Sequence, residues 1–256
     1  MFRLAVAVSL LISAVCAVGQ NPQSSDPFAV SLAQKSVTAL TGGAPVADVT
    51  LNADVISIYG SDNETGTGSF KAKGFAESRV DMSLSGGTRS DVRTAAGGGA
   101  WSANGAAARP YAGHNCRTDA AWFFPVLSAL AATATPNFIF KYIAQEQHGS
   151  VSTQHIRIFQ IVPNDPAGIL QRLGTEDVYL DLSSGLPVAV AFKSHPDNDL
   201  NTDIDTEARF ANYQAVSGIL IPFHFQQMIN GSVVLDVIVT SAAVNTGLVD
   251  SLFTLP

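Results

Sequence analysis

The sequence predicts a mainly β protein of the α+β class, built on one large, strongly curved antiparallel sheet with two or three helices. Only 14% of its residues are charged, 46% are hydrophobic and 21 are glycine, whereas helical bundles usually carry more charge. Beyond residue 46, apolar and polar residues alternate with a period of two, which is typical of half-buried strands. Short turns separate these segments, which favours antiparallel pairing over parallel βαβ units.

An amphipathic helix is expected at the start of the folded region. Asp26 and Pro27 supply an N-cap and a proline at the first helical position. Gly42 and Gly43 are expected to end this helix. Its apolar face consists of Ala29, Ala33, Val37 and Leu40.

The first strands follow directly. Val49, Leu51, Ala53 and Val55 alternate with polar residues, and the stretch 60–68 is expected to turn the chain. Further strands are expected at 69–74, 80–84 and 89–93. Segment 95–113 is rich in glycine and alanine, which predicts a loop or an irregular strand around Trp101.

A second helix is expected to begin at Asp119 and to run through Trp122 and Phe123 toward Ala132. The stretch 120–140 lacks charged residues and is long enough to span a bilayer. Prolines and polar residues interrupt it, however, and no basic clusters flank it. A helix tucked into the fold is therefore favoured over a membrane span.

The remaining residues predict mostly hairpins. Two expected strands, 138–147 and 151–162, precede a short helical insert between Asp165 and Gly174. The later expected turns are Ser183-Ser184-Gly185, Ser217-Gly218 and Asn230-Gly231. The total is nine or ten antiparallel strands.

The N-terminus resembles a secretory signal peptide. Arg3 precedes an uncharged apolar run and then small residues, which predicts a signal peptide at 1–19 and a single domain at 20–256. Lipidation at Cys16 is the alternative, although Val15 rather than a small residue precedes that cysteine. Cleavage after Ala17 would leave Cys116 as the single thiol of the mature chain. The protein is therefore expected in the periplasm or secreted, as part of a bacterial cell envelope.

The charge of the chain argues against nucleic-acid partners. The net charge is −7, and removal of Arg3 leaves 13 basic against 21 acidic residues, a charge of −8. A chain this acidic is repelled by phosphate backbones and by anionic membrane surfaces. We expect a monomer that binds no nucleic acid.

Several motifs together resemble a known superfamily. They are Gly68–Gly74, Ser78–Asp81, Tyr179–Asp181, Ser184–Pro187, Glu207–Tyr213 and the terminal Leu252–Pro256. In order and spacing they resemble the LolA/LolB-like superfamily of periplasmic outer-membrane lipoprotein-sorting and lipoprotein carrier proteins, in a divergent branch. The resemblance implies an unclosed half-barrel whose concave face is covered by helices, with an apolar cavity for acyl chains between them. None of Arg79, Arg89 and Arg93 aligns with the superfamily's lid-locking arginine.

Candidate ligand-binding residues follow from this architecture. The inward aliphatic residues and the helix aromatics that would line the cavity are Leu51, Val55, Phe70, Val80, Met82, Leu84, Trp122 and Phe123. The alternative is that these side chains fill a solid core, because packed interiors leave few voids. A cavity of this kind needs no cofactor and no catalytic group.

An acidic loop offers the sharpest local alternative. The oxygen ligands Asp197, Asp199, Asn201 and Asp203 have the alternating spacing of a calcium loop. Thr202 and Ala208 stand where such a loop requires glycine and a bidentate glutamate. A solvated acidic hairpin loop is the favoured interpretation.

The function expected is that of an exported, non-enzymatic carrier that binds lipid or lipoprotein acyl chains. One alternative is an envelope sensor or scaffold that uses the same fold to bind a protein partner. The other is an exported hydrolase, but the chain has no G-x-S-x-G motif and its histidines show no metal-binding spacing.

Overall fold

A single antiparallel sheet of 13 strands dominates the computed structural model, which describes residues 23–255. The strands are β1 (Asp48–Tyr59), β2 (Asp62–Lys73), β3 (Glu77–Leu84), β4 (Gly87–Arg93), β5 (Gly99–Ala103), β6 (Arg109–Pro110), β7 (Phe138–His148), β8 (Val151–Gln160), β9 (Glu176–Asp181), β10 (Pro187–Ser194), β11 (Ile204–Val216), β12 (Ile219–Ile229) and β13 (Ser232–Val244). The helices are α1 (Pro27–Thr41) and α2 (Ile169–Leu173), with 3-10 turns η1 (Gly113–Cys116), η2 (Pro125–Leu127), η3 (Ala129–Ala134) and η4 (Asp250–Phe253).

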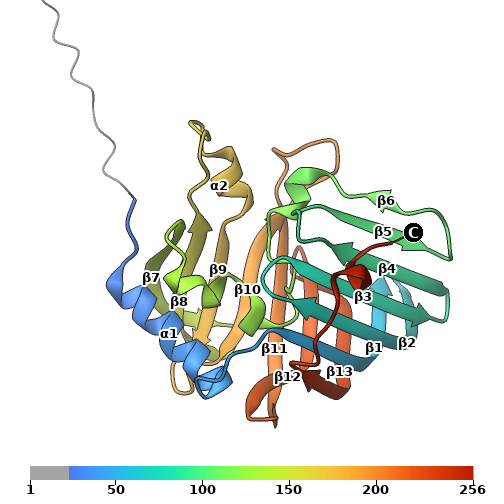
Figure 1. The fold of residues 1–256 in the computed structure, drawn as a ribbon, viewed down its shortest axis with the longest axis horizontal. Helices are drawn as coiled ribbons and strands as arrows, with labels where there is room; N and C mark the ends of the chain where they lie inside the picture. Colours follow the sequence, from blue (N-terminus) through green and yellow to red (C-terminus); the bar gives the residue numbers. More distant parts are fainter. Residues whose placement is uncertain (1–22, 256) are drawn as a thin grey trace, which may run out of the picture.

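The strand order shows how the chain builds the sheet. β1 lies in its interior, paired with β2 on one side and β13 on the other. From β1 the chain runs outward to β6, crosses the sheet through residues 111–137, and returns from β7 at the opposite edge to β13 (Figure 1). The two edges, β6 and β7, do not pair with each other, so the sheet stays open.

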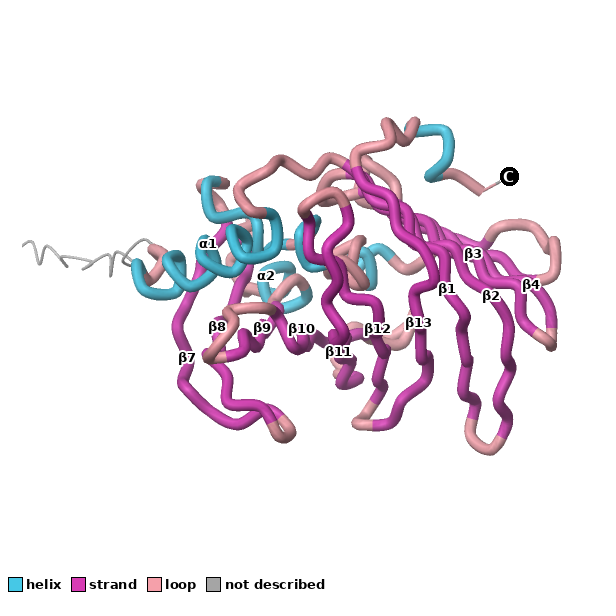
Figure 2. Tube along the Cα trace, turned by 90° about the horizontal axis from the view of Figure 1, so that it is seen from below, coloured by secondary structure: helices cyan, strands magenta, loops and turns pink. Residues whose placement is uncertain are grey.

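The predicted fold class is confirmed. Figure 2 shows the bent sheet with α1 on one side of it. We call residues 111–137 the crossing segment; together with α1 it covers the concave face. The inward side chains of the sheet pack there against this layer, and Leu51, Phe70 and Leu130 of η3 belong to the same buried cluster.

Helix α1 forms as its sequence predicts. The Asp26 carboxylate accepts a hydrogen bond from the Phe28 backbone N–H at 2.8 Å, and Pro27 begins the helix. Gly42 ends it in the left-handed conformation, with φ of 60°. Ala29, Ala33 and Leu40 are completely buried, so this helix closes one side of the core.

The expected helix from Asp119 to Ala132 is wrong. The crossing segment instead makes two separate 3-10 turns, η2 and η3. Ser128 between them is extended (φ −122°, ψ 175°), and Pro125 supplies no N–H for a helical hydrogen bond. The carboxylate of Asp119 accepts hydrogen bonds from the N–H of Ala129, ten residues later, instead of capping its own first turn.

Two further expectations for the first half of the sheet change. The turn placed at 60–68 is confined to Gly60 and Ser61, because β2 already begins at Asp62 and pairs with β1 along its whole length. Segment 95–113, expected as a loop or an irregular strand, contains β5 around Trp101 and the short β6. β5 and β6 are among the strands by which the total of 13 exceeds the nine or ten expected.

The predicted signal peptide at 1–19 and Cys16 lie outside the described residues. None of the helices within residues 23–255 is long and apolar enough to cross a membrane. The stretch 120–140 lies within the fold, where Phe123, Phe124 and Leu130 are buried.

Candidate functional site

A cavity of about 570 Å³ lies on the concave face, beneath the crossing segment. We call it the concave cavity; its lining includes Ser57, Tyr59, Val80, Met82, Arg89, Asp91, Arg93, Tyr111, Asn115, Trp122, Phe192, Lys193 and Leu235. These residues come from both halves of the sheet and from the segment that crosses it. Its volume falls within the range of roughly 300–1,000 Å³ that is typical of small-molecule pockets.

One part of the cavity wall is apolar. Val80 and Met82 of β3 alternate toward the same face of the sheet, and Leu235 of β13 lies across from them. Trp122 reaches this surface from the crossing segment and meets the Phe225 ring edge-on, with 5.9 Å between ring centroids. This arrangement gives the cavity an apolar surface on both its sheet side and its cover side.

The other part of the wall carries charged side chains, and three of them come from one strand. Arg89, Asp91 and Arg93 occupy alternate positions of β4, so all three project from the same face of the sheet. Hydrogen bonds hold the Arg89 side chain in place, because its guanidinium donates to the Glu64 carboxylate at 2.5 Å and to the Ser57 hydroxyl at 3.2 Å. Charged residues at every second position between Thr88 and Arg93 are the sequence signal for this row, but alternation alone does not place the row on a cavity wall.

Asp91 and Arg93 have weaker partners. Asp91 accepts a hydrogen bond from the Tyr111 hydroxyl, and burial raises the pKa of its carboxyl to about 6, against the opposing charges of Arg93 and Arg89. The Arg93 guanidinium donates to the backbone carbonyl of Asn115 at 2.6 Å and lies 5.6 Å from the centroid of the Tyr111 ring. Both side chains therefore connect the sheet to the cover.

The eight residues predicted to line a cavity separate into two groups. Val80, Met82 and Trp122 line the concave cavity. The other five belong to the packed core and do not line it: Leu51, Val55, Phe70, Leu84 and Phe123. Phe70 meets the Phe123 ring edge-on at 5.4 Å, which shows how tightly this part of the concave side is filled. The binding role of all eight stays a prediction.

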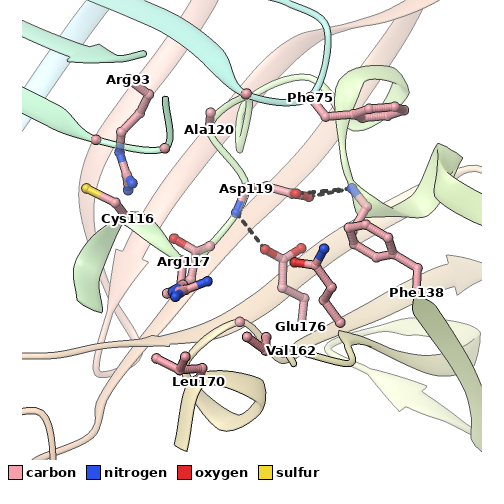
Figure 3. Close-up of a pocket in the computed structure, with 17 residues that line it drawn as sticks. Phe75, Arg93, Cys116, Arg117, Asp119, Ala120, Phe138, Val162, Leu170 and Glu176 are labelled. Carbon is pink, nitrogen blue, oxygen red and sulfur yellow. Dashed lines mark hydrogen bonds between the residues drawn. The ribbon is translucent and has the colours of Figure 1, made fainter. Parts of the chain in front are cut away.

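A smaller pocket of about 170 Å³ lies beside the concave cavity, with Arg93 in the walls of both. Figure 3 shows Asp119 and Glu176 facing each other inside it, with Cys116 and Arg117 nearby. The Glu176 carboxyl accepts a hydrogen bond from the Asp119 backbone N–H at 2.7 Å. Burial and the negative charge of Asp119 raise the pKa of Glu176 well above its ordinary value, so Glu176 is the protonated member of the pair.

The acidic loop does not bring the calcium-ligand candidates together. Asp197 accepts a hydrogen bond from Asn115, whereas Asp203 accepts from Arg172 at 2.7 Å. Asp199 accepts from the backbone N–H of Asn201 within the loop. Each carboxylate is therefore engaged by a different protein donor, and residues 23–255 contain no group of three or more His, Cys, Asp or Glu residues arranged to hold a metal ion.

The histidines of the described chain are engaged mostly with carboxylates. His155 lies between Glu146 and Asp177, at 2.7 Å and 2.9 Å, and His224 lies 2.6 Å from Asp236. Within residues 23–255 no serine or cysteine side chain is hydrogen-bonded to a histidine ring. The histidine rings therefore serve mainly as hydrogen-bond partners of carboxylates on neighbouring segments.

Comparison with solved structures identifies the fold. A domain described as an outer membrane lipoprotein-sorting protein from Vibrio parahaemolyticus superimposes with a TM-score of 0.55 at 12% identity, over 88% of this chain and 96% of that one. A LolA superfamily protein from Nitrosomonas europaea gives the same score and identity, over 89% of this chain and 97% of that one. A DUF1329 family protein from Desulfovibrio piger gives 0.56 at 10% identity, over 89% and 96%.

These likenesses confirm, at the level of the fold, the resemblance that the sequence motifs predict. No protein-family model and no curated protein sequence matches the chain. At 10–12% identity these likenesses show the fold alone and carry no information about individual site residues.

Proposed function

We propose that this chain, which has the fold of LolA superfamily proteins, is a non-enzymatic binding protein that carries a lipid or a lipoprotein acyl chain in its concave cavity. The observation that carries the proposal is the cavity itself, about 570 Å³ between the bent sheet and its cover. Val80, Met82 and Trp122 give it the apolar surface that an acyl chain requires.

Burial of apolar surface alone supplies enough affinity for this role. Each buried methylene contributes about 0.8 kcal/mol, so ten methylenes contribute on the order of 8 kcal/mol before ordering costs. Binding and release then need no covalent step. The predicted signal peptide would place this activity in the periplasm or outside the cell, where acyl chains must cross an aqueous space.

The proposal is tested by native mass spectrometry and by displacement of a neutral apolar fluorophore, N-phenyl-1-naphthylamine. We expect purified protein to carry lipid, and stripped protein to bind the fluorophore until a long-chain lipid displaces it. Met82→Trp fills the cavity and should weaken fluorophore binding at least tenfold. Ile238→Trp is the matched control, because Ile238 lies on the sheet with 47% of its surface exposed and does not line the cavity.

Two results would contradict the carrier proposal. One is protein that neither carries lipid nor binds the fluorophore. The other is Met82→Trp binding the fluorophore as well as wild type does, since the apolar probe would then lie elsewhere. A stable protein partner, retained by the filled variant, would favour the scaffold alternative instead.

A further inference from the structure

The charged row on β4 bears on the kind of ligand that the concave cavity takes, and the inference that follows rests on the proposed carrier function. Arg89 and Arg93 are two strand positions apart and face the same cavity. Arg89 is already neutralised by Glu64 at 2.5 Å. Within residues 23–255, Arg93 forms no salt bridge: its hydrogen bond goes to the backbone carbonyl of Asn115.

Within residues 23–255, most N–H donors of the Arg93 guanidinium therefore remain available to a ligand. A guanidinium carries five N–H donors, and the Asn115 carbonyl engages one nitrogen of Arg93. Its stacking partner, Tyr111, neutralises no charge. The third cation on the cavity wall, Lys193, is paired with Asp205. Within the described chain, Arg93 is thus the lining cation best able to accept an anionic group.

Three carboxyl groups on the cavity wall oppose this attraction: those of Asp91, Asp119 and Asp197. Asp119 accepts from the Ala129 N–H and Asp197 from the Asn115 amide. Asp91 lies between the two arginines, so its ionised carboxylate competes most directly for Arg93 and repels an incoming anion. The Tyr111 hydroxyl donates to Asp91 and partly offsets that charge. Removal of the Asp91 charge should consequently strengthen anion binding, whereas removal of the Arg93 charge should weaken it.

We propose that the concave cavity binds a single-chain amphiphile with an anionic head, whose head lies against Arg93 and whose chain lies against Val80, Met82 and Trp122. The cavity volume of about 570 Å³ suits one chain with its head. The opposed apolar and charged walls match the two ends of such a molecule.

Two probes with the same acyl chain test the proposal: lysophosphatidylglycerol, with an anionic head, and monoacylglycerol, with a neutral one. Each competes with N-phenyl-1-naphthylamine at low ionic strength and at pH 7.5. In the wild-type protein we expect the anionic probe to bind at least roughly tenfold more tightly, the effect of one hydrogen-bonded charge. Arg93→Gln should remove that preference by lowering the affinity for lysophosphatidylglycerol to that for monoacylglycerol.

Three variants make the result specific. Asp91→Asn should strengthen binding of the anionic probe severalfold, the opposite of Arg93→Gln. Arg93→Lys should keep part of the preference, because the charge remains. Arg109→Gln is the matched control: Arg109 is exposed, lies over the Trp101 ring at 5.4 Å and does not line the cavity.

The outcomes are separable. Equal binding of the two probes by wild type would overturn the headgroup inference and leave the carrier function standing. Displacement of the fluorophore by inorganic phosphate alone would also overturn it, because a small anion would then suffice. If neither probe binds, the proposed function itself fails.

Discussion

Glu176→Gln should abolish a loss of stability that the wild-type protein shows as the pH rises. In the folded protein, burial and the charge of Asp119 raise the pKa of Glu176 well above its ordinary value of 4.5, to which it returns on unfolding. Between these two pKa values the folded state binds more protons than the unfolded state. The free energy of unfolding therefore falls by about 1.4 kcal/mol per pH unit across that window, beginning near pH 4.5.

Glutamine reproduces the protonated form of Glu176. In the wild-type protein the Asp119 backbone N–H donates to a carboxyl oxygen of Glu176 at 2.7 Å, and the amide oxygen of glutamine can accept the same hydrogen bond. The NH₂ group of glutamine can donate to the Asp119 carboxylate. The variant should match wild type near pH 4.5 and exceed it increasingly at higher pH. Urea unfolding at pH 5, 6, 7 and 8, followed by tryptophan fluorescence, measures both slopes.

Glu207→Gln is the control with the opposite sign. Burial acts to raise the pKa of Glu207, but its bonds to His148 and Arg209 outweigh burial and lower it. Its contribution to stability is therefore present above the ordinary pKa and is lost as the pH falls through the folded value. Equal slopes for wild type and Glu176→Gln between pH 5 and pH 8 would refute the reasoning.

Five further substitutions test the packing and the hydrogen bonds of the fold, and the urea midpoint measures the effect of each. Ser36→Ala should raise the free energy of unfolding by about 1 kcal/mol, because the buried Ser36 hydroxyl has no hydrogen-bond partner within residues 23–255. Ser57→Ala should lower it by about 1 kcal/mol, because the change removes a hydrogen-bond partner of Arg89. Phe70→Ala should lower the free energy of unfolding by about 3–5 kcal/mol, because Phe70 is fully buried. Phe75→Ala should lower it by less than about 0.5 kcal/mol, because that side chain is 50% exposed. Similar losses for the two variants would contradict the assignment of Phe70 to the core. Asp48→Ala should cost about 1–3 kcal/mol and speed hydrogen exchange in the C-terminal segment, because the Asp48 carboxylate accepts three consecutive backbone N–H groups there; unchanged exchange would contradict this.

The strands and helix α1 could be predicted because local rules determine them. Asp26-Pro27 and Gly42 fix the ends of α1, and the Asn230-Gly231 turn has both residues at positive φ (48° and 79°), as a tight hairpin requires. Alternation along β1 correctly identified Leu51 and Val55 as inward residues. Periodicity, however, reports only which face a residue occupies.

The crossing segment shows where local rules stop. Asp119 resembles a helix N-cap, yet in the structure it binds a backbone N–H ten residues away and meets Glu176 from a distant strand. Such partners are brought together only by the fold. For the same reason the sequence could not separate Val80, which lines the cavity, from Phe70, which faces inward on the next strand and is sealed in the core.

Quenching of a single tryptophan by a brominated acyl chain tests the carrier account most directly. The chain has two tryptophans, and Trp101→Phe leaves Trp122 on the cavity wall as the one reporter. A fatty acid brominated along its chain should quench Trp122 saturably, and an unlabelled chain should reverse the quenching. Quenching that is absent, or equally strong in a variant whose cavity is filled at Met82, would contradict the presence of an acyl chain on the concave face.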